Sequence, residues 1–136
     1  MTLVDSNVVL DVVTRDPRWL SWSLAHLETA GAQGELVIND IVYAEISIGY
    51  ERVEEVDDLV SAMALKYASI PQPALFLAGK VFKRYRAAGG IRSSVLPDLF
   101  IGAHAAVLGI PLLTRDPRRY RTYFPTVLLI APEPSM

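Results

Sequence analysis

The sequence predicts a single α/β domain built on a central parallel sheet of four to five short strands, flanked by helices on both faces in three layers. Short apolar runs alternate with helical segments, a pattern typical of parallel sheets with right-handed crossovers. Hydrophobic residues make up 51% of the 136 residues, as expected for a sheet covered on both faces. The length fits one domain. We expect this domain to span residues 1–131, followed by a loose tail at 132–136.

Five apolar runs have the length and composition of short strands. Most are followed by a turn, a cap residue or a proline, which marks where each strand ends. The predicted strands cover residues 2–5, 35–38, 68–70, 110–113 and 127–130.

Segments with apolar residues at helical spacing lie between these runs. Ser6 or Asn7 is expected to cap a short helix over residues 8–13, and Asp16 to cap a helix over about 18–30. Asn39 is expected to cap a third helix. The remaining helical segments pass through residues 53–63, 73–88 and 97–108, with a helical turn at 118–121.

Residues 96–116 combine one of these helices with a buried strand. Pro97 suits the first helical position, and Asp98 then lies in the first turn, where the helix dipole favours a carboxylate. Thr114 and Asp116 stand at the carboxyl end of the following strand, the edge where open parallel sheets bind ligands. This unit therefore predicts two carboxylates directed at one place.

Two further acids can join this pair. Asp5 ends the first strand, and Glu45 lies about one and a half turns into the helix that follows the second strand. If these strands are neighbours, the four carboxylates meet and need a counter-charge, because like charges raise each other's pKa. A site of oxygen ligands without cysteine favours Mg²⁺ or Mn²⁺.

Most of these acids also have a purely structural explanation. Asp5 fits a turn, Asp98 fits the helix dipole, and Asp116 fits an N-cap before Pro117. Glu45 is the hardest to explain in this way, because it lies inside an apolar helix. The residues alone leave both the metal site and the structural roles open.

Composition limits the possible functions. A net charge of −2 argues against non-specific affinity for nucleic acid, and the absence of cysteine excludes disulfides and thiolate metal sites. No apolar run is long enough to span a membrane, and Asp5 interrupts the apolar N-terminus, which argues against a signal peptide. We expect a cytoplasmic protein.

Four segments together resemble the PIN-domain ribonucleases, particularly the VapC-type toxins of toxin–antitoxin pairs. Residues 3–7 (LVDSN) are similar to the family's opening strand and acid, and residues 45–49 (EISIG) to its glutamate helix. Residues 97–105 (PDLFIGAHA) are similar to its Asp-led helix of small residues, and residues 113–116 (LTRD) to its final Thr-x-Asp. Asn39 departs from the pattern, because serine is usual before the glutamate helix.

The resemblance implies metal-dependent endonucleolytic cleavage of RNA by attack of water on a phosphodiester. The implied cofactor is Mg²⁺, with Mn²⁺ as an alternative. Three aspartates would hold the first ion, and the glutamate would complete its shell through water or help to bind a second ion. The implied catalytic and metal-binding residues are Asp5, Glu45, Asp98 and Asp116, with Asn7 and Thr114 as supporting polar neighbours.

The resemblance also implies partners. A homodimer is expected, as is a cognate antitoxin whose C-terminal segment blocks the acidic pocket. Beside that pocket a basic cluster offers guanidinium groups for RNA phosphates, and an ordinary solvated turn is the alternative interpretation. The candidate phosphate contacts are Arg115, Arg118 and Arg119.

Two other functions stay open. A receiver-like signalling domain also gathers acids at a sheet edge, but it normally needs a lysine after a late strand, and Lys66, Lys80 and Lys83 do not fit. A PIN-like fold without activity could act only as a binding module; the full set of acids argues against it.

Two features fall outside the predicted site. His104 lies six positions after Asp98, well off the same helix face, so we expect a packing or surface role. The segment Thr-Arg-Asp-Pro-Arg at 14–18 recurs at 114–118. We interpret this repeat as coincidence, because Asp116 follows a strand and Asp16 follows a helix, away from the sheet edge.

Overall fold

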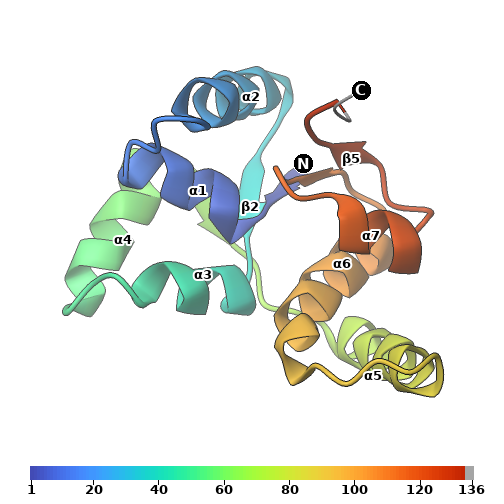
Figure 1. The fold of residues 1–136 in the computed structure, drawn as a ribbon. Helices are drawn as coiled ribbons and strands as arrows, with labels where there is room; N and C mark the ends of the chain where they lie inside the picture. Colours follow the sequence, from blue (N-terminus) through green and yellow to red (C-terminus); the bar gives the residue numbers. More distant parts are fainter. Residues whose placement is uncertain (134–136) are drawn as a thin grey trace.

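The computed structural model describes residues 1–133 and contains a five-stranded parallel sheet (Figure 1). The strand order is β3-β2-β1-β4-β5, which places the first strand of the chain at the centre. The predicted α/β/α class with a parallel sheet is confirmed. The strands are β1 (Thr2–Val4), β2 (Leu36–Ile38), β3 (Leu65–Tyr67), β4 (Leu112–Leu113) and β5 (Leu129–Ile130).

The chain winds outward from β1 in both directions. It first builds β2 and β3 on one side, and then returns past β1 to build β4 and β5 on the other. Because crossovers are right-handed, this reversal puts the two sets of helices on opposite faces of the sheet. Figure 1 shows α1 to α4 grouped on the left and α5 to α7 on the lower right.

Seven helices flank the sheet in the described part of the chain. None of them is long and apolar enough to cross a membrane. The first four are α1 (Ser6–Val13), α2 (Leu20–Gln33), α3 (Asp40–Ser47) and α4 (Val53–Ala62). The other three are α5 (Gln72–Ala87), α6 (Leu96–Leu108) and α7 (Arg118–Tyr123), and a 3₁₀ turn at Ser93–Val95 precedes α6.

Small residues let α6 lie close to its neighbours. A Cβ at Gly102 would lie 2.4 Å from Cδ2 of Phe124, so the phenyl ring occupies the space that a side chain would need. Phe124 follows α7, and this contact fixes α7 against α6. Gly109 ends α6 in the left-handed conformation (φ +65°), which glycine adopts without steric strain.

Two predicted details are wrong. The third strand covers 65–67 rather than 68–70; Lys66 and Tyr67 are exposed on this edge strand, so it carries no apolar run that reveals it. Neither Ser6 nor Asn7 caps α1. That role belongs to Asp5, whose Oδ1 accepts a hydrogen bond from the Ser6 backbone amide.

Other boundaries shift by a few residues. Helix α2 begins at Leu20 rather than 18, although Asp16 does accept hydrogen bonds from the backbone amides of Arg18 and Trp19. Asn39 caps α3 as predicted, accepting from the amides of Ile41 and Val42. Of the predicted loose tail, residues 134–136 lie outside the described part of the chain, and its looseness stays a prediction.

Candidate active site at the carboxyl edge of the sheet

The candidate site lies at the switch point between β1 and β4, where the strand order reverses. In open α/β sheets, ligands bind in the crevice outside the carboxyl ends of such strands. Asp5 follows β1 directly, and its backbone amide donates to the carbonyl of Leu113 in β4. Thr114 follows β4, so the two strand ends place these two side chains together.

Asp5 is the most buried of the candidate acids, with 4% of its surface exposed. Its Oδ2 accepts hydrogen bonds from the Thr114 hydroxyl at 2.8 Å and from the Tyr120 hydroxyl at 3.0 Å. Burial raises the pKa of Asp5 to about 6, assisted by the negative charges of Asp98 and Glu45 and opposed by these hydrogen bonds. Near neutral pH, a charge on Asp5 is therefore costly without a cation.

Asp98 lies in the first turn of α6 and faces α7. Its Oδ2 accepts a short, charge-assisted hydrogen bond from Nη1 of Arg119, and its Oδ1 lies 3.4 Å from the Tyr120 hydroxyl. Burial raises the pKa of Asp98, and the charge of Asp116 adds to this rise, while Arg119 opposes it. Arg119 is thus the cation that partly compensates this group of carboxylates.

Glu45 approaches from α3 on the other side of Asp5. Its Oε1 accepts a hydrogen bond of 2.9 Å from the Ser6 hydroxyl, which ties α3 to the start of α1. Partial burial raises the pKa of Glu45, the Ser6 hydrogen bond opposes this, and the charge of Asp98 adds to it. Glu45 therefore interacts electrostatically with Asp98, although no direct hydrogen bond joins it to another acid within residues 1–133.

Asp116 is the most exposed member of the predicted set. Its backbone amide donates to the Thr114 hydroxyl at 3.1 Å, and its side chain lines a hollow of about 330 Å³ together with Asp98, Arg118 and Arg119. Asp116 thus stands at the solvent side of the group, opposite the buried Asp5.

The two polar neighbours connect the strand ends. Asn7 Nδ2 lies 3.3 Å from the Thr114 hydroxyl and 3.5 Å from Asp5 Oδ2, and Asn7 Oδ1 accepts from the backbone amide of Arg115. The Thr114 hydroxyl donates to Asp5 and accepts from the Asp116 amide, so it links both segments. These contacts fix the distance between the loops that carry Asp5 and Asp116.

The donor set fits a hard divalent cation, although the present arrangement is not a closed cage. All the candidate ligands are oxygens, and of these acids only Asp98 is paired with a guanidinium within residues 1–133. Within residues 1–133, however, no three acids or histidines are grouped closely enough to enclose an ion. The ion pair to Arg119 and the hydrogen bonds to Tyr120 hold Asp98 and Asp5 in place instead.

Tyr120 is the residue at this site that the sequence reasoning missed. Its side chain is 2% exposed, and its hydroxyl lies between Asp5 and Asp98. The two carboxylates raise the pKa of Tyr120 beyond the effect of burial, so its phenol keeps its proton and donates. The only signal in the sequence is a tyrosine among arginines, on a six-residue helix that has little other apolar surface to bury.

Not all of the predicted basic cluster points to solvent. The Arg115 Nε donates to both oxygens of Asp11, a carboxylate 2% exposed that also accepts from the Ser23 hydroxyl. Arg119 is paired with Asp98. Arg118 alone among the three candidates is exposed and forms no ion pair within residues 1–133.

His104 has a packing role, as expected. It is 1% exposed inside α6, and its Nδ1 forms a hydrogen bond of 3.1 Å with the Asn39 side chain. Burial lowers the pKa of His104, which keeps the ring neutral near pH 7. The residue therefore ties α6 to the cap of α3 and has no contact with the acidic group.

Comparisons with known proteins agree with this architecture. A family model described as the PIN domain matches residues 2–125. No curated protein sequence matches the chain significantly. Among solved structures, a chain of VapBC2 from Rickettsia felis bound to a DNA fragment from its promoter superposes with a TM-score of 0.73, at 18% identity, covering 96% of this chain and 97% of that one.

Two further structures are similar over nearly the whole chain. VapBC-1 from nontypeable Haemophilus influenzae has a TM-score of 0.70 at 16% identity, covering 96% of both chains. A toxin–antitoxin complex from Klebsiella pneumoniae has a TM-score of 0.67 at 20% identity, covering 94% of this chain and 96% of that one. At these identities, the likeness is one of fold.

Proposed function

We propose that this chain, which belongs to the PIN domain family, is a metal-dependent endoribonuclease and the toxin of a toxin–antitoxin pair. The observation that carries the proposal is the electrostatic group at the β1–β4 switch point. There, burial and neighbouring negative charges raise the pKa of Asp5, Glu45 and Asp98, and Asp98 and Asp116 line a hollow open to solvent. Repulsion among these carboxylates destabilises the folded protein, and a divalent cation would offset it.

The residues proposed to hold the ion are Asp5, Asp98 and Asp116. Asp5 would supply the buried ligand, fixed by Thr114, and Asp116 would supply the ligand nearest to solvent. Asp98 would be released from Arg119 as the ion enters. When bound, Mg²⁺ or Mn²⁺ would lower the pKa of a water nucleophile and neutralise charge on the phosphate.

Glu45 has a different proposed role. Its carboxylate accepts a hydrogen bond from Ser6 and from none of the other acids within residues 1–133, and its raised pKa would make it a stronger proton acceptor than an ordinary glutamate. Arg119, once released from Asp98, is positioned beside the hollow, where its guanidinium can meet a phosphate oxygen. In this proposal Glu45 would act as the base, and Arg119 would supply the cation that meets the phosphate.

The test is cleavage of a panel of structured RNAs with Mg²⁺, with Mn²⁺ and with EDTA. Wild-type protein is expected to cleave with either ion and not with EDTA. Asp5→Asn and Asp98→Asn are expected to lose about 100-fold or more in rate, as is usual when a group that carries catalysis is removed, and the exposed Asp58→Asn serves as the matched control. Equal cleavage by all four proteins would refute the site assignment, and no cleavage of any RNA would favour a non-catalytic binding module.

Membership of the PIN domain family sets aside the receiver-like alternative. In support of this, no lysine lines the hollow that contains Asp98 and Asp116. A receiver-like domain would need that amine for the phosphoryl group.

The proposed partner is a small antitoxin, and the proposed assembly is a homodimer. The solved neighbours are chains of toxin–antitoxin complexes, and this chain exposes large apolar side chains, including Ile48 (86%), Phe76 (68%) and Ile91 (82%). Surfaces of this kind are common at protein interfaces. Light scattering of the purified chain tests the dimer, and co-purification with the product of an adjacent gene tests the antitoxin.

A further inference from the structure

The repeated Thr-Arg-Asp-Pro-Arg segments meet in space. Arg18 ends the first copy and Trp19 follows it. These two residues line one hollow of about 630 Å³ together with Arg115 and Arg118 of the second copy. Asp16 caps the turn before α2, as expected. The interpretation of the repeat as coincidence overlooked the residues at this cap, because Arg18 and Trp19 line the same hollow as Arg115, which follows β4.

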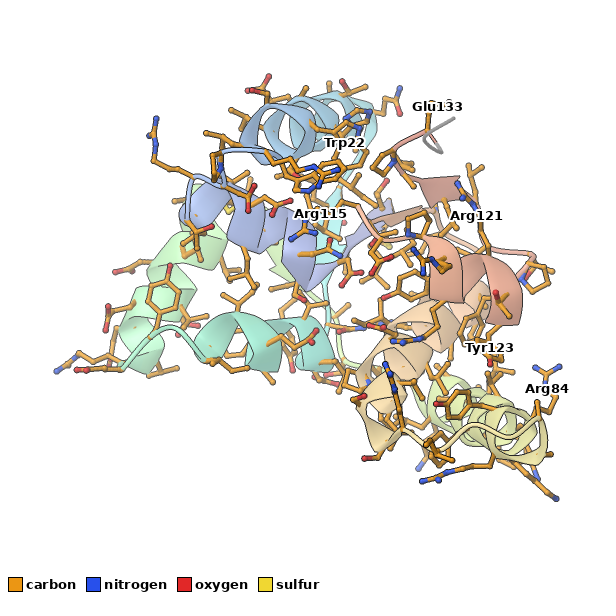
Figure 2. The ribbon with its side chains drawn as sticks, viewed as in Figure 1. Trp22, Arg84, Arg115, Arg121, Tyr123 and Glu133 are labelled. Carbon is orange, nitrogen blue, oxygen red and sulfur yellow. The ribbon has the colours of Figure 1, made fainter. Side chains whose placement is uncertain are left out.

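This hollow, which we call the basic hollow, carries three unpaired cations. Arg18, Arg118 and Arg121 line it, are exposed, and form no ion pair within residues 1–133. Two carboxylates, Asp116 and Glu133, also line it. Figure 2 shows Arg121 and Glu133 near the C-terminal segment and Arg115 beside α1. Arg115 is already neutralised by Asp11, so the unpaired charge comes from the other three arginines.

Trp19 gives one wall of the basic hollow a fixed shape. The guanidinium carbon of Arg18 lies 5.2 Å from the centre of the Trp19 ring, and that of Arg115 lies 5.7 Å from it. Trp22 packs edge-on against the same ring at 6.1 Å. Arg115 is in turn held by the buried Asp11. The aromatic wall therefore orders Arg18 instead of leaving it free in solvent.

The basic hollow is continuous with the acidic site. Asp116, Arg118 and Thr122 line both this hollow and the smaller one that contains Asp98. A strand with one negatively charged group beside the acids can therefore place neighbouring negative groups beside the three arginines. Phosphates along a nucleic acid strand have this arrangement, and guanidinium groups match them in geometry.

We propose that the basic hollow binds the single-stranded RNA segment that flanks the cleaved phosphodiester, with Arg18, Arg118 and Arg121 each contacting a backbone phosphate. This inference deepens the proposed function and rests on it for the identity of the ligand. It also revises the predicted phosphate contacts: Arg115 supports the wall, Arg119 serves the acidic site, and Arg18 and Arg121 take their place.

The test measures binding, so that it does not depend on cleavage. A fluorescein-labelled 12-nucleotide single-stranded RNA of mixed sequence is titrated with Asp5→Asn protein, which retains the basic hollow. In that background, the triple variant Arg18→Ala, Arg118→Ala, Arg121→Ala is expected to bind about tenfold or more weakly. The slope of log K against log salt is expected to fall by about 2, at about 0.7 for each phosphate that is no longer neutralised.

The matched control removes the same charge elsewhere. Lys66, Lys80 and Lys83 are exposed and line neither hollow, so their triple alanine variant should keep the affinity and the slope of the parent. Equal reductions in affinity for both triples would overturn the proposal, because net charge would then explain the binding. Circular dichroism melting of each variant confirms that the protein is folded.

A 12-residue polyglutamate peptide separates RNA from an acidic protein segment. If the arginine triple no longer binds the peptide but keeps the RNA, the basic hollow is a protein-docking site and the proposal is wrong. The failure of the proposed function would look different. In that case wild-type protein would cleave no RNA, while the binding difference between the two triples would remain.

Discussion

Arg119 of α7 and Asp98 of α6 form an ion pair at the edge of the hollow that Asp98 and Asp116 line. The guanidinium of Arg119 donates to the carboxylate that we propose as a metal ligand, and its charge opposes the rise in the pKa of Asp98. The pair also ties α7 to α6 beside the contact between Phe124 and Gly102.

Removing Arg119 should therefore strengthen metal binding. Arg119→Ala frees Asp98 from its competing cation, and we expect about two- to fivefold tighter binding of Mn²⁺, equivalent to about 0.5–1 kcal/mol for a partly exposed pair. Isothermal titration calorimetry with the metal alone measures the change. Arg121→Ala, which removes an unpaired arginine from the same helix, should leave the affinity unchanged. Weaker binding by the Arg119 variant would contradict the competition between the guanidinium and the ion.

Tyr120→Phe should loosen the acidic group. The change deletes the hydroxyl that lies between Asp5 and Asp98, and we expect the free energy of unfolding to fall by about 1.5 kcal/mol. We also expect a reduction of about tenfold in kcat with little change in KM, because Asp5 is no longer held in its orientation. Tyr123→Phe on the same helix is the control. A variant with wild-type stability and kcat would show that the phenol hydroxyl is dispensable.

The stability of the metal-free protein should fall as the pH rises from about 4 to 6. The pKa of Asp5 is raised in the folded state to about 6 from an ordinary value of 3.8, so the folded protein binds this proton more tightly than the unfolded chain does. That stabilisation is present below pH 3.8 and is lost as the pH rises through about 6. Its full size is about 3 kcal/mol.

Urea denaturation in EDTA across this pH range measures the effect. Asp5→Asn should flatten the profile, because its side chain cannot ionise and still caps α1. The exposed Asp58→Asn should keep the wild-type profile. A profile that rises with pH in the wild-type protein would mean that Asp5 is stabilised as a carboxylate, against the expectation from its burial.

Gly102→Ala should destabilise the domain by about 1–3 kcal/mol. Its Cβ would lie 2.4 Å from the Phe124 ring, which must then move away from α6. Gly79→Ala is a matched control in α5, where a new Cβ meets nothing within 4 Å and better helix propensity should add about 0.5–1 kcal/mol. Thermal melting that showed the same sign for both variants would refute the packing argument.

The sequence predicted the architecture because its strongest signals are local. The apolar runs and the Asn39 cap each depend on neighbouring residues, and the structure bears out the cap and four of the five predicted strands. The edge strand β3 was misplaced because exposed edge strands lack an apolar run. Asp5 was predicted to end β1, but its role as a cap could not be separated from those of Ser6 and Asn7 by spacing alone.

The surroundings of the candidate site could not be predicted in the same way. The placement of Tyr120 between two acids depends on the packing of α7 on α6, which no local pattern encodes. The ion pair of Arg115 with the buried Asp11 joins residues 104 positions apart, so the sequence did not show which arginines of the cluster are paired. The repeat at 14–18 and 114–118 was visible, but its proximity in space was not.

The hydrogen bonds of Asp5 also bear on the timing of synthesis. Its partners Thr114 and Tyr120 are 109 and 115 residues away, so a residue at the start of the domain depends on residues near the domain's end. Domains fold as units once enough of the chain has emerged, and long-range pairings such as β1 with β4 form late. A nascent chain still short of β4 thus has no assembled acidic group. Under the proposed function, nuclease activity would therefore arise only after nearly the whole domain had left the ribosome.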